Sequence, residues 1–336
     1  MSNSIVTGGA GFMGAHVAKH LLNNGHKVII LDDLSGGSKH NIPEGAKFIN
    51  GSITDKELVQ NIFENNAIEY VFHLAAYAAE GLSHFIRHYN YTNNVIGSIN
   101  LINASINYNV KCFVFTSSIA VYGEGTLPLK EEMITLPEDP YGIAKLTVEQ
   151  DLESAHNMFG LNYIIFRPHN VYGEYQNIGD RYRNVVGIFM NQLMQKKPLT
   201  VFGNGEQTRA FSYIGDVAPY IANSIDSHNV YNNIFNIGSD NACNINHLAE
   251  NVMNAMKIKG QINYLPERNE VLHAYSDHSK FYEYFHVNQS SFTYLEKGLQ
   301  KMADWAQTVG VRKSSSFSNI EITKNLPPSW QNTEKV

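Results

Sequence analysis

Short apolar runs alternate with longer amphipathic stretches through the first half of the chain. Residues 4–7 and 27–31 are apolar runs of strand length, and the second is rich in β-branched residues. Between them, apolar residues recur at helical spacing from Phe12 to Leu22, and Gly25 follows as a stop signal. This pattern predicts a strand, a helix and a second strand.

The alternation continues as far as Pro168. Strands are expected at residues 47–51, 70–76, 111–118 and 162–168, and helices at residues 55–66, 89–109 and 141–160. Strands that alternate with helices are typical of a parallel sheet covered on both faces. The sequence therefore predicts an α/β fold with a Rossmann-type, doubly wound parallel sheet.

Beyond Pro168 the alternation gives way to longer loops rich in Gly, Asn, Tyr and Arg. We expect a second, smaller α/β domain that binds the substrate to begin there. The predicted boundaries are residues 1–168 with about 208–240 for the first domain, and 169–207 with about 241–336 for the second. The polar tail after about Lys313 is expected to be loosely held.

Composition and charge narrow the class of protein. The 336 residues are 43% hydrophobic and 17% charged, which is ordinary for a globular protein. A net charge of −6, with lysines and arginines scattered singly, argues against a nucleic-acid partner. No stretch approaches the roughly 18 apolar residues of a membrane span, and the first residues lack the pattern of a secretory signal. We therefore expect a cytoplasmic protein with no membrane partner.

Cysteine and histidine give no sign of a disulfide framework or a metal site. Cys112 and Cys243 are far apart and outside any C-x-x-C pattern. The 14 histidines are not grouped at ligand spacing with each other or with cysteine and aspartate. We expect no bound metal.

A glycine-rich turn joins the first predicted strand to the first predicted helix. Gly8, Gly11 and Gly14 are spaced G-x-x-G-x-x-G, which lets the backbone approach a pyrophosphate and directs helix N–H groups toward it. Such spacing also occurs in plain tight turns, but Asp32 ends the next strand 18 residues after Gly14. Its carboxylate can accept hydrogen bonds from ribose hydroxyls and would repel a 2′-phosphate. The turn therefore predicts NAD rather than NADP.

A tyrosine and a lysine lie one helical turn apart further along the chain. Tyr141 and Lys145 share a helix face, and Ser118 ends a strand 23 residues before Tyr141. A free tyrosine, with a pKa of about 10, is ionised to only about one part in a thousand at pH 7. The lysine ammonium and the charge of an oxidised nicotinamide are both expected to lower that pKa, so that Tyr141 takes a proton from a hydroxyl that Ser118 orients. Most such pairs are ordinary helix-surface residues, and the dinucleotide turn is what favours the catalytic interpretation.

Several segments together resemble a known family. They are TGGAGFMG, LDDLSGG, HLAA, NNVIGSINLI, SSIAVYG, DPYGIAK, RPHNVYG and FGNGEQTRAFSYIGDVA. Their order is that of the extended short-chain dehydrogenase/reductase family, and within it the chain looks most like the NAD-dependent nucleotide-sugar epimerase/dehydratase group of the UDP-glucose 4-epimerase type. The resemblance covers about residues 4–290. It implies a nucleotide-sugar substrate and a homodimer formed through the helices over residues 93–106 and 141–156.

The resemblance also implies binding residues for the cofactor and the substrate. The expected NAD contacts are Gly8, Gly11, Phe12, Met13, Gly14, Asp32, Leu34, Ser35, Gly36, Ser52, Ile53, Leu74, Ala75, Ala76, Asn94, Tyr141, Lys145 and Pro168. The expected substrate contacts are Ser118, Asn170, Arg209, Arg268 and Glu270, with both arginines on the diphosphate. Two features depart from the family pattern. Ser52 stands where an aspartate is common, and the segment 267–271 is one residue shorter than the usual form.

The residues before the VYG turn bear on the type of reaction. Related dehydratases and decarboxylases carry carboxylates there, whereas this chain has Ile119 and Ala120, which cannot move a proton. The cysteine that related epimerase-reductases place near this point is also missing. The resemblance then implies reversible oxidation at C4 of UDP-glucose or UDP-galactose through a 4-keto sugar. Ala274 aligns where some epimerases carry a bulky aromatic residue, so an N-acetylhexosamine pair is a further hypothesis.

Three alternatives remain open at this point. The protein could be a net 4-dehydrogenase, an epimerase of a CDP-, GDP- or dTDP-sugar, or a regulator that keeps the fold without the reaction. His169, between Pro168 and Asn170, either contacts the sugar or fills space, and the sequence does not decide between these roles.

Overall fold

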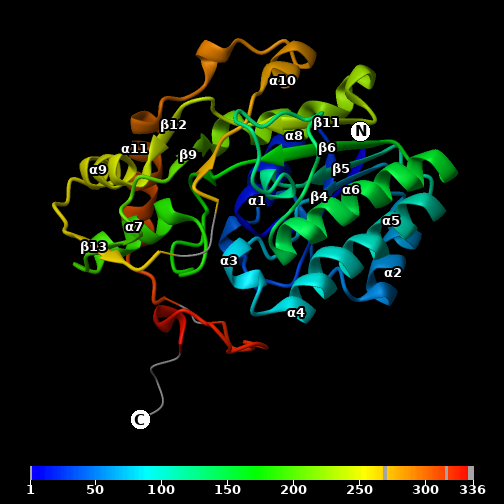
Figure 1. The fold of residues 1–336 in the computed structure, drawn as a ribbon. Helices are drawn as coiled ribbons and strands as arrows, with labels where there is room; N and C mark the ends of the chain where they lie inside the picture. The colour runs from blue at the N-terminus through cyan, green and yellow to red at the C-terminus, as the bar shows by residue number, and fades with distance from the viewer. Residues whose placement is uncertain (1, 268–270, 315–316, 332–336) are drawn as a thin grey trace.

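The computed structural model describes residues 2–267, 271–314 and 317–331. Within these residues, a seven-stranded parallel sheet forms the centre, with the order β11-β6-β5-β4-β1-β2-β3 (Figure 1). Its strands are β1 (Asn3–Thr7), β2 (Lys27–Asp32), β3 (Lys47–Asn50), β4 (Tyr70–His73), β5 (Cys112–Thr116), β6 (Tyr163–Pro168) and β11 (Asn233–Ile237). The predicted Rossmann-type sheet is confirmed, and its strand order changes direction between β1 and β4.

Successive residues of each central strand pack into two different cores. Ile5 and Phe113 lie in one core with α2 (Lys56–Asn66), α5 (Gly97–Asn107) and α6 (Pro140–Phe159). Their neighbours Val6 and Val114 lie in the other core with α1 (Phe12–Asn23) and α8 (Ala218–Asn223). Because both faces are covered, these strands are continuous apolar runs in the sequence.

The long helix expected over residues 89–109 is interrupted. The chain forms α4 (Arg87–Tyr91), a π-helical turn (Thr92–Ile96) and then α5. Within the π-helical turn, Asn94 Oδ1 accepts a hydrogen bond from the backbone N–H of Tyr77 (2.9 Å). The strand expected over residues 70–76 is shorter and ends at His73. The segment after His73 leaves the sheet, and its Tyr77 is the residue that Asn94 contacts. A π-helical turn next to a functional site is a common arrangement.

Beyond Pro168, short sheets and helices form a lobe beside the central sheet, on the left in Figure 1. Strand β8 (Leu199–Phe202) pairs with β13 (Ile262–Leu265), and β9 (Thr208–Ala210) lies between β12 (Ala242–Asn244) and β14 (His273–Ala274). The remaining helices and strands of the described chain, not all of which belong to this lobe, are α3 (Glu80–Ser83), β7 (Val171–Tyr172), α7 (Val185–Met194), β10 (Ser212–Tyr213), α9 (Ile245–Met256), α10 (Ser279–Tyr284) and α11 (Leu295–Val309). Strand β9 pairs within the lobe although it falls in the segment assigned to the first domain. The domain division itself remains a prediction.

The tail after Lys313 is not loosely held where the structure describes it. Trp330 is only 4% exposed, and its ring meets those of Tyr182 and Phe85 edge-on, with centroids 5.3 and 6.1 Å apart. Leu326, 8% exposed, packs in the same apolar cluster. The expectation was wrong because a few apolar anchors within a polar sequence are enough to fix a segment.

Candidate active site

A cavity of about 1110 Å³ lies where the carboxyl ends of β1, β2, β4, β5 and β6 meet the lobe. Its wall includes residues that directly follow these strands and, from the lobe, Arg209 and Ala274. Ligands of open α/β sheets bind at this edge, at the point where the strand order changes direction.

The glycine turn forms one wall of this cavity. Gly8 has a φ of +70°, and a Cβ atom there would lie 2.8 Å from the backbone of Ala75. A Cβ atom on Gly14 would lie 2.1 Å from the carbonyl oxygen of Gly8. Helix α1 starts directly after this turn with no acidic residue in its first turn and no side-chain cap. The turn is therefore closely packed, and the positive end of the helix dipole borders the cavity.

Asp32 is held in a fixed position at the end of β2. Its Oδ2 accepts a hydrogen bond from the N–H of Ala10 (3.0 Å), and its Oδ1 accepts one from Leu34 (2.7 Å). Burial raises the pKa of this carboxyl, and the backbone N–H groups oppose the rise. Leu34 does not itself line the cavity, so its place in the structure is that of a support for Asp32.

This wall fits a nicotinamide dinucleotide. The packed glycines leave room for a pyrophosphate, and Asp32 borders the cavity with a carboxylate. Thr116 also lines it, and its buried hydroxyl oxygen has no hydrogen-bond partner among the described residues. A buried polar atom of this kind is accounted for when a ligand supplies the missing bond.

Most of the predicted site residues border this one cavity. The cofactor set there is Gly8, Gly11, Phe12, Met13, Gly14, Asp32, Ser35, Gly36, Ser52, Ile53, Leu74, Ala75, Ala76, Tyr141, Lys145 and Pro168, and the substrate set is Ser118, Asn170 and Arg209. Asn94 is buried outside the cavity and holds the backbone of Tyr77. Arg268 and Glu270 lie outside the described residues. The individual contacts remain predictions.

Tyr141 stands in the first turn of α6, and the local sequence explains its position. Asp139 caps the helix, because its Oδ1 accepts hydrogen bonds from the N–H groups of Tyr141 (2.8 Å) and Gly142 (3.0 Å). Ser118 lies close enough to Tyr141 for its side chain to favour a lower pKa of the phenol. Lys145 follows one turn later, with Nζ 5.8 Å from the centroid of the Tyr141 ring. The three predicted catalytic residues therefore lie together.

Burial shifts the pKa values of both Tyr141 and Lys145. Burial raises the pKa of Tyr141, and the carboxylate of Glu80 adds to the rise. Burial also lowers the pKa of Lys145 to about 7, and its Nζ donates to the carbonyl oxygen of Thr116 (2.7 Å). At pH 7 this lysine carries only about half of a positive charge. The expected lowering of the Tyr141 pKa involves the lysine and an oxidised nicotinamide together, and it remains a prediction.

A second wall of the cavity was not predicted from the sequence. Tyr77, Glu80 and His84 line it from the segment after β4, and Lys324 and Trp330 line it from the tail. No spacing rule connects these segments. The one available signal was the unusual mixture of charged and aromatic residues directly after a strand end, where binding residues concentrate.

None of the described helices is long and apolar enough to cross a membrane. Over the described ranges, no group of three or more His, Cys, Asp or Glu side chains is arranged to hold a metal ion.

Comparison with known proteins identifies the family. Residues 4–238 match the NAD dependent epimerase/dehydratase family. A putative UDP-glucose 4-epimerase from Methanocaldococcus jannaschii is 35% identical over 304 residues, which cover 90% of this chain and 97% of that protein.

Two solved structures share the fold over most of their length. The UDP-glucose 4-epimerase of Thermotoga maritima, crystallised with UDP-glucose, is similar with a TM-score of 0.85 and 33% identity, and the match covers 91% of this chain and 99% of that one. The UDP-N-acetylglucosamine 4-epimerase of Methanobrevibacter ruminantium, in complex with UDP-N-acetylmuramic acid, is similar with a TM-score of 0.83 and 31% identity, covering 90% and 97%. The family match and the fitted dinucleotide wall lead to one conclusion: this chain is an enzyme of the NAD-dependent epimerase/dehydratase family, with NAD as its cofactor.

Proposed function

We propose that this enzyme is a 4-epimerase of a nucleotide-activated hexose, with the UDP-glucose/UDP-galactose pair as its substrates. The observation that carries the proposal is the contact of Ser118 with Tyr141 at the edge of the dinucleotide cavity, where Ile119 and Ala120 also line the wall. At this place the chain offers hydroxyl groups and apolar groups, which suit reversible oxidation of an alcohol. A carboxylate for elimination is not supplied by this turn.

Each residue of the set has a defined role in the proposed reaction. Tyr141 takes the proton of the C4 hydroxyl and returns it at the end of the cycle, and Ser118 orients that hydroxyl. Lys145 adds positive charge beside the phenol to the extent that it is protonated. Bound NAD would supply a reversible hydride acceptor for C4 and a second positive charge. That charge is needed because burial holds the pKa of Tyr141 above its ordinary value.

Arg209 supports the proposal at the diphosphate. Its guanidinium group is held by the carbonyl oxygens of Thr208 and Leu272, each 2.9 Å from Nη1. It also lines the cavity, so a fixed cation with further donors faces the space where a diphosphate would lie. The planar fork of arginine suits two phosphate groups.

The N-acetylhexosamine pair is a second candidate, favoured by Ala274. This residue lines the cavity and packs beside the cluster of Ile119 and Leu129. A methyl group at this position leaves more room for a C2 substituent than an aromatic ring would. Of the two related structures named above, one is a UDP-glucose 4-epimerase and the other is a UDP-N-acetylglucosamine 4-epimerase.

We also propose that two copies pair through α5 and α6 to form a dimer. Four large apolar side chains are exposed on or next to these helices: Ile96 just before α5, and Ile143, Met158 and Phe159 on α6. Exposed apolar side chains of this size are typical of an interface when they are grouped.

The proposal is tested by incubating the purified enzyme with UDP-glucose and, separately, with UDP-N-acetylglucosamine, without added reductant. We expect the H4 and anomeric NMR signals of the galacto isomer to appear. Absence of isomer from both sugars, with NAD still bound, would contradict the proposal, and accumulation of NADH would indicate a net dehydrogenase.

Replacing Tyr141 with Phe keeps the ring and removes only the acid–base group. We expect the Tyr141→Phe variant to lose about a thousandfold in kcat while retaining bound NAD. Tyr231→Phe is the matched control, because its hydroxyl donates to the carbonyl of Ile225 and does not line the cavity. Turnover by Tyr141→Phe at the rate of the control would exclude the mechanism.

A further inference from the structure

His169 lines the cavity between Pro168 and Asn170, yet both of its ring nitrogens already have partners. Its Nδ1 lies 3.0 Å from the carbonyl oxygen of Ala210, and its Nε2 lies 3.0 Å from Nε2 of His278. The side chain is 3% exposed. His169 therefore has no free nitrogen to offer a sugar hydroxyl.

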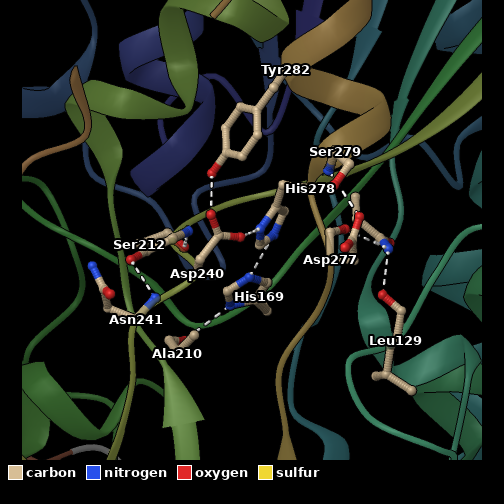
Figure 2. A network of polar contacts seen from close by, with 12 residues as sticks. Leu129, His169, Ala210, Ser212, Asp240, Asn241, Asp277, His278, Ser279 and Tyr282 are labelled. Atoms are coloured by element: carbon tan, nitrogen blue, oxygen red, sulfur yellow. Dashed lines mark hydrogen bonds and ion pairs between the residues drawn. The ribbon is translucent and has the colours of Figure 1, made fainter. Parts of the chain in front are cut away.

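The contacts continue away from the cavity through two further bonds (Figure 2). Nδ1 of His278 lies 2.5 Å from Oδ1 of Asp240, and the hydroxyl of Tyr282 donates to Oδ2 of the same carboxylate (2.7 Å). His278 is 1% exposed. The chain thus leads from the partly exposed Asp240 through two buried rings to the cavity wall.

The partners fix where the protons must lie. The carbonyl of Ala210 only accepts, so Nδ1 of His169 carries a hydrogen. Asp240 accepts from Tyr282, and when ionised it also accepts from Nδ1 of His278. One more proton must lie between the two facing Nε2 atoms, because two lone pairs 3.0 Å apart would repel each other. With Asp240 ionised, the two rings together carry one positive charge, and the carboxylate balances it.

That charge belongs mainly to His278. Burial and, to a smaller extent, the neighbouring His278 lower the pKa of His169 to about 3. Neutral His169 then accepts at Nε2 the hydrogen that His278 donates.

We propose that Asp240, His278 and His169 form a charged positioning chain that fixes the end of β6 against β9 and so sets the distance between the substrate residues Asn170 and Arg209. The identity of the ligand as a nucleotide sugar rests on the proposed function, whereas the chain itself rests on the geometry alone.

The position of Ala210 explains why this chain reaches the substrate residues. Ala210 directly follows Arg209 on β9, and its carbonyl oxygen accepts from both His169 Nδ1 and Asn170 Nδ2 (3.2 Å). Asn170 has a φ of +37°, so its backbone conformation needs support from its surroundings. His169 supplies this support from within the protein.

Gly238 shows how closely this arrangement is packed. It follows β11 with a φ of +157°, and a Cβ atom there would lie 2.6 Å from Nε2 of His169. The hydroxyl of Ser212 would be 2.4 Å away on the other side. The histidine contact is therefore held by backbone that admits only glycine.

Four other ionisable groups lie near the chain. Tyr282 is bonded to Asp240, and the negative charge of Asp240 together with burial raises its pKa. Asp277 precedes His278, and Glu131 is close enough for His278 to lower its pKa against the effect of burial. Lys280 faces Glu131 from the next turn. His278 is thus placed among carboxylates.

The first test reads the proton positions directly. Protein labelled with ¹⁵N-histidine is compared with the His169→Gln and His278→Gln variants by long-range ¹H–¹⁵N correlation NMR at pH 7. We expect the His169 pattern of a neutral ring protonated at Nδ1, and the His278 pattern of a doubly protonated ring. A neutral His278 would overturn the charged chain whether or not the proposed function holds.

The second test separates positioning from packing by kinetics. His278→Leu removes the bond to His169, and we expect KM for the nucleotide sugar to rise about tenfold with kcat within threefold. His278→Gln keeps an amide donor toward His169 without the charge, and Asp240→Asn keeps the ring but weakens its charge, so each is expected to give a smaller rise. Bound NAD is expected to stay unchanged throughout.

His156→Gln is the matched control, because its Nδ1 bonds the carbonyl of Leu161 at the far end of α6. If His278→Leu fails to fold, the His278→Gln and Asp240→Asn variants carry the test. Equal KM values in the wild type, these two variants and the control would overturn the positioning role. Binding of UDP, measured by calorimetry, gives the same comparison if neither sugar is turned over.

Discussion

The two walls of the cavity are built in opposite ways. The cofactor wall is formed by a single short stretch around the glycine turn, together with Asp32 at the end of the adjacent strand. The second wall joins the segment of α3 and α4 to the tail, and the residues in contact there are more than 230 positions apart in sequence. There, the Glu321 carboxylate accepts hydrogen bonds from the backbone N–H groups of His88 (2.7 Å) and Tyr89 (2.8 Å).

This difference shows which kinds of site can be read from a sequence. The glycine turn is specified by backbone geometry, because only glycine fits at positions such as Gly14. The tail wall is specified by side-chain packing, in which Phe317 meets Tyr77 and Tyr89 at 5.3 and 5.0 Å between ring centroids. Many other aromatic residues could satisfy the same packing, so no fixed spacing marks it.

The largest effect is expected from Gly14→Ala, which places a Cβ atom 2.1 Å from the carbonyl oxygen of Gly8. Backbone must shift to accept it, and we expect the purified variant to lose most of its bound NAD, with affinity reduced about a hundredfold. Gly125→Ala is the matched control, because Gly125 does not line the cavity and a Cβ atom there would meet only the flexible end of Leu129 at 3.0 Å. Equal NAD content in the two variants would break the comparison.

An intermediate effect is expected from Lys145→Met, and it depends on pH. Burial lowers the pKa of Lys145 from 10.5 to about 7. Between these values the unfolded chain holds a proton that the native chain has released, so the free energy of unfolding rises with pH across this window. At and below pH 7 the native state keeps a buried charge, and its removal is expected to stabilise the protein by about 2–3 kcal/mol after the lost bond to Thr116 is deducted.

Urea unfolding at pH 6 and pH 9.5 checks this expectation. The advantage of Lys145→Met over the wild type should shrink at the higher pH, and the exposed Lys19→Met variant should behave like the wild type at both. An advantage that does not change with pH would show that the buried ammonium is not its cause.

The smallest effect on stability is expected from Trp330→Ala in the tail wall. The ring packs against Tyr182 and Phe85 but lies at the end of the described chain, so its loss releases the tail without opening either main core. We expect a decrease of about 1–2 kcal/mol in the free energy of unfolding and faster proteolysis after residue 313. Met158→Ala, at a side chain that is 74% exposed, is the control. Unchanged proteolysis would mean that the tail is held by other contacts.

The sequence by itself determined the parallel α/β sheet and the NAD cofactor, because both are encoded by local spacing, and it indicated the family through the order of several similar segments. The strand and helix periods, the glycine turn and the i, i+4 pair of Tyr141 and Lys145 all act through backbone geometry over a few residues.

Only the tertiary structure decided the protonation of the site, the tail wall and the role of His169. Burial sets the raised pKa of Tyr141 and the lowered pKa of Lys145, and burial is a property of the folded chain. His169 acquires its role from His278, which is 109 residues away in sequence. Contacts of this kind depend on how distant segments pack together, and the order of residues along the chain does not specify them one by one.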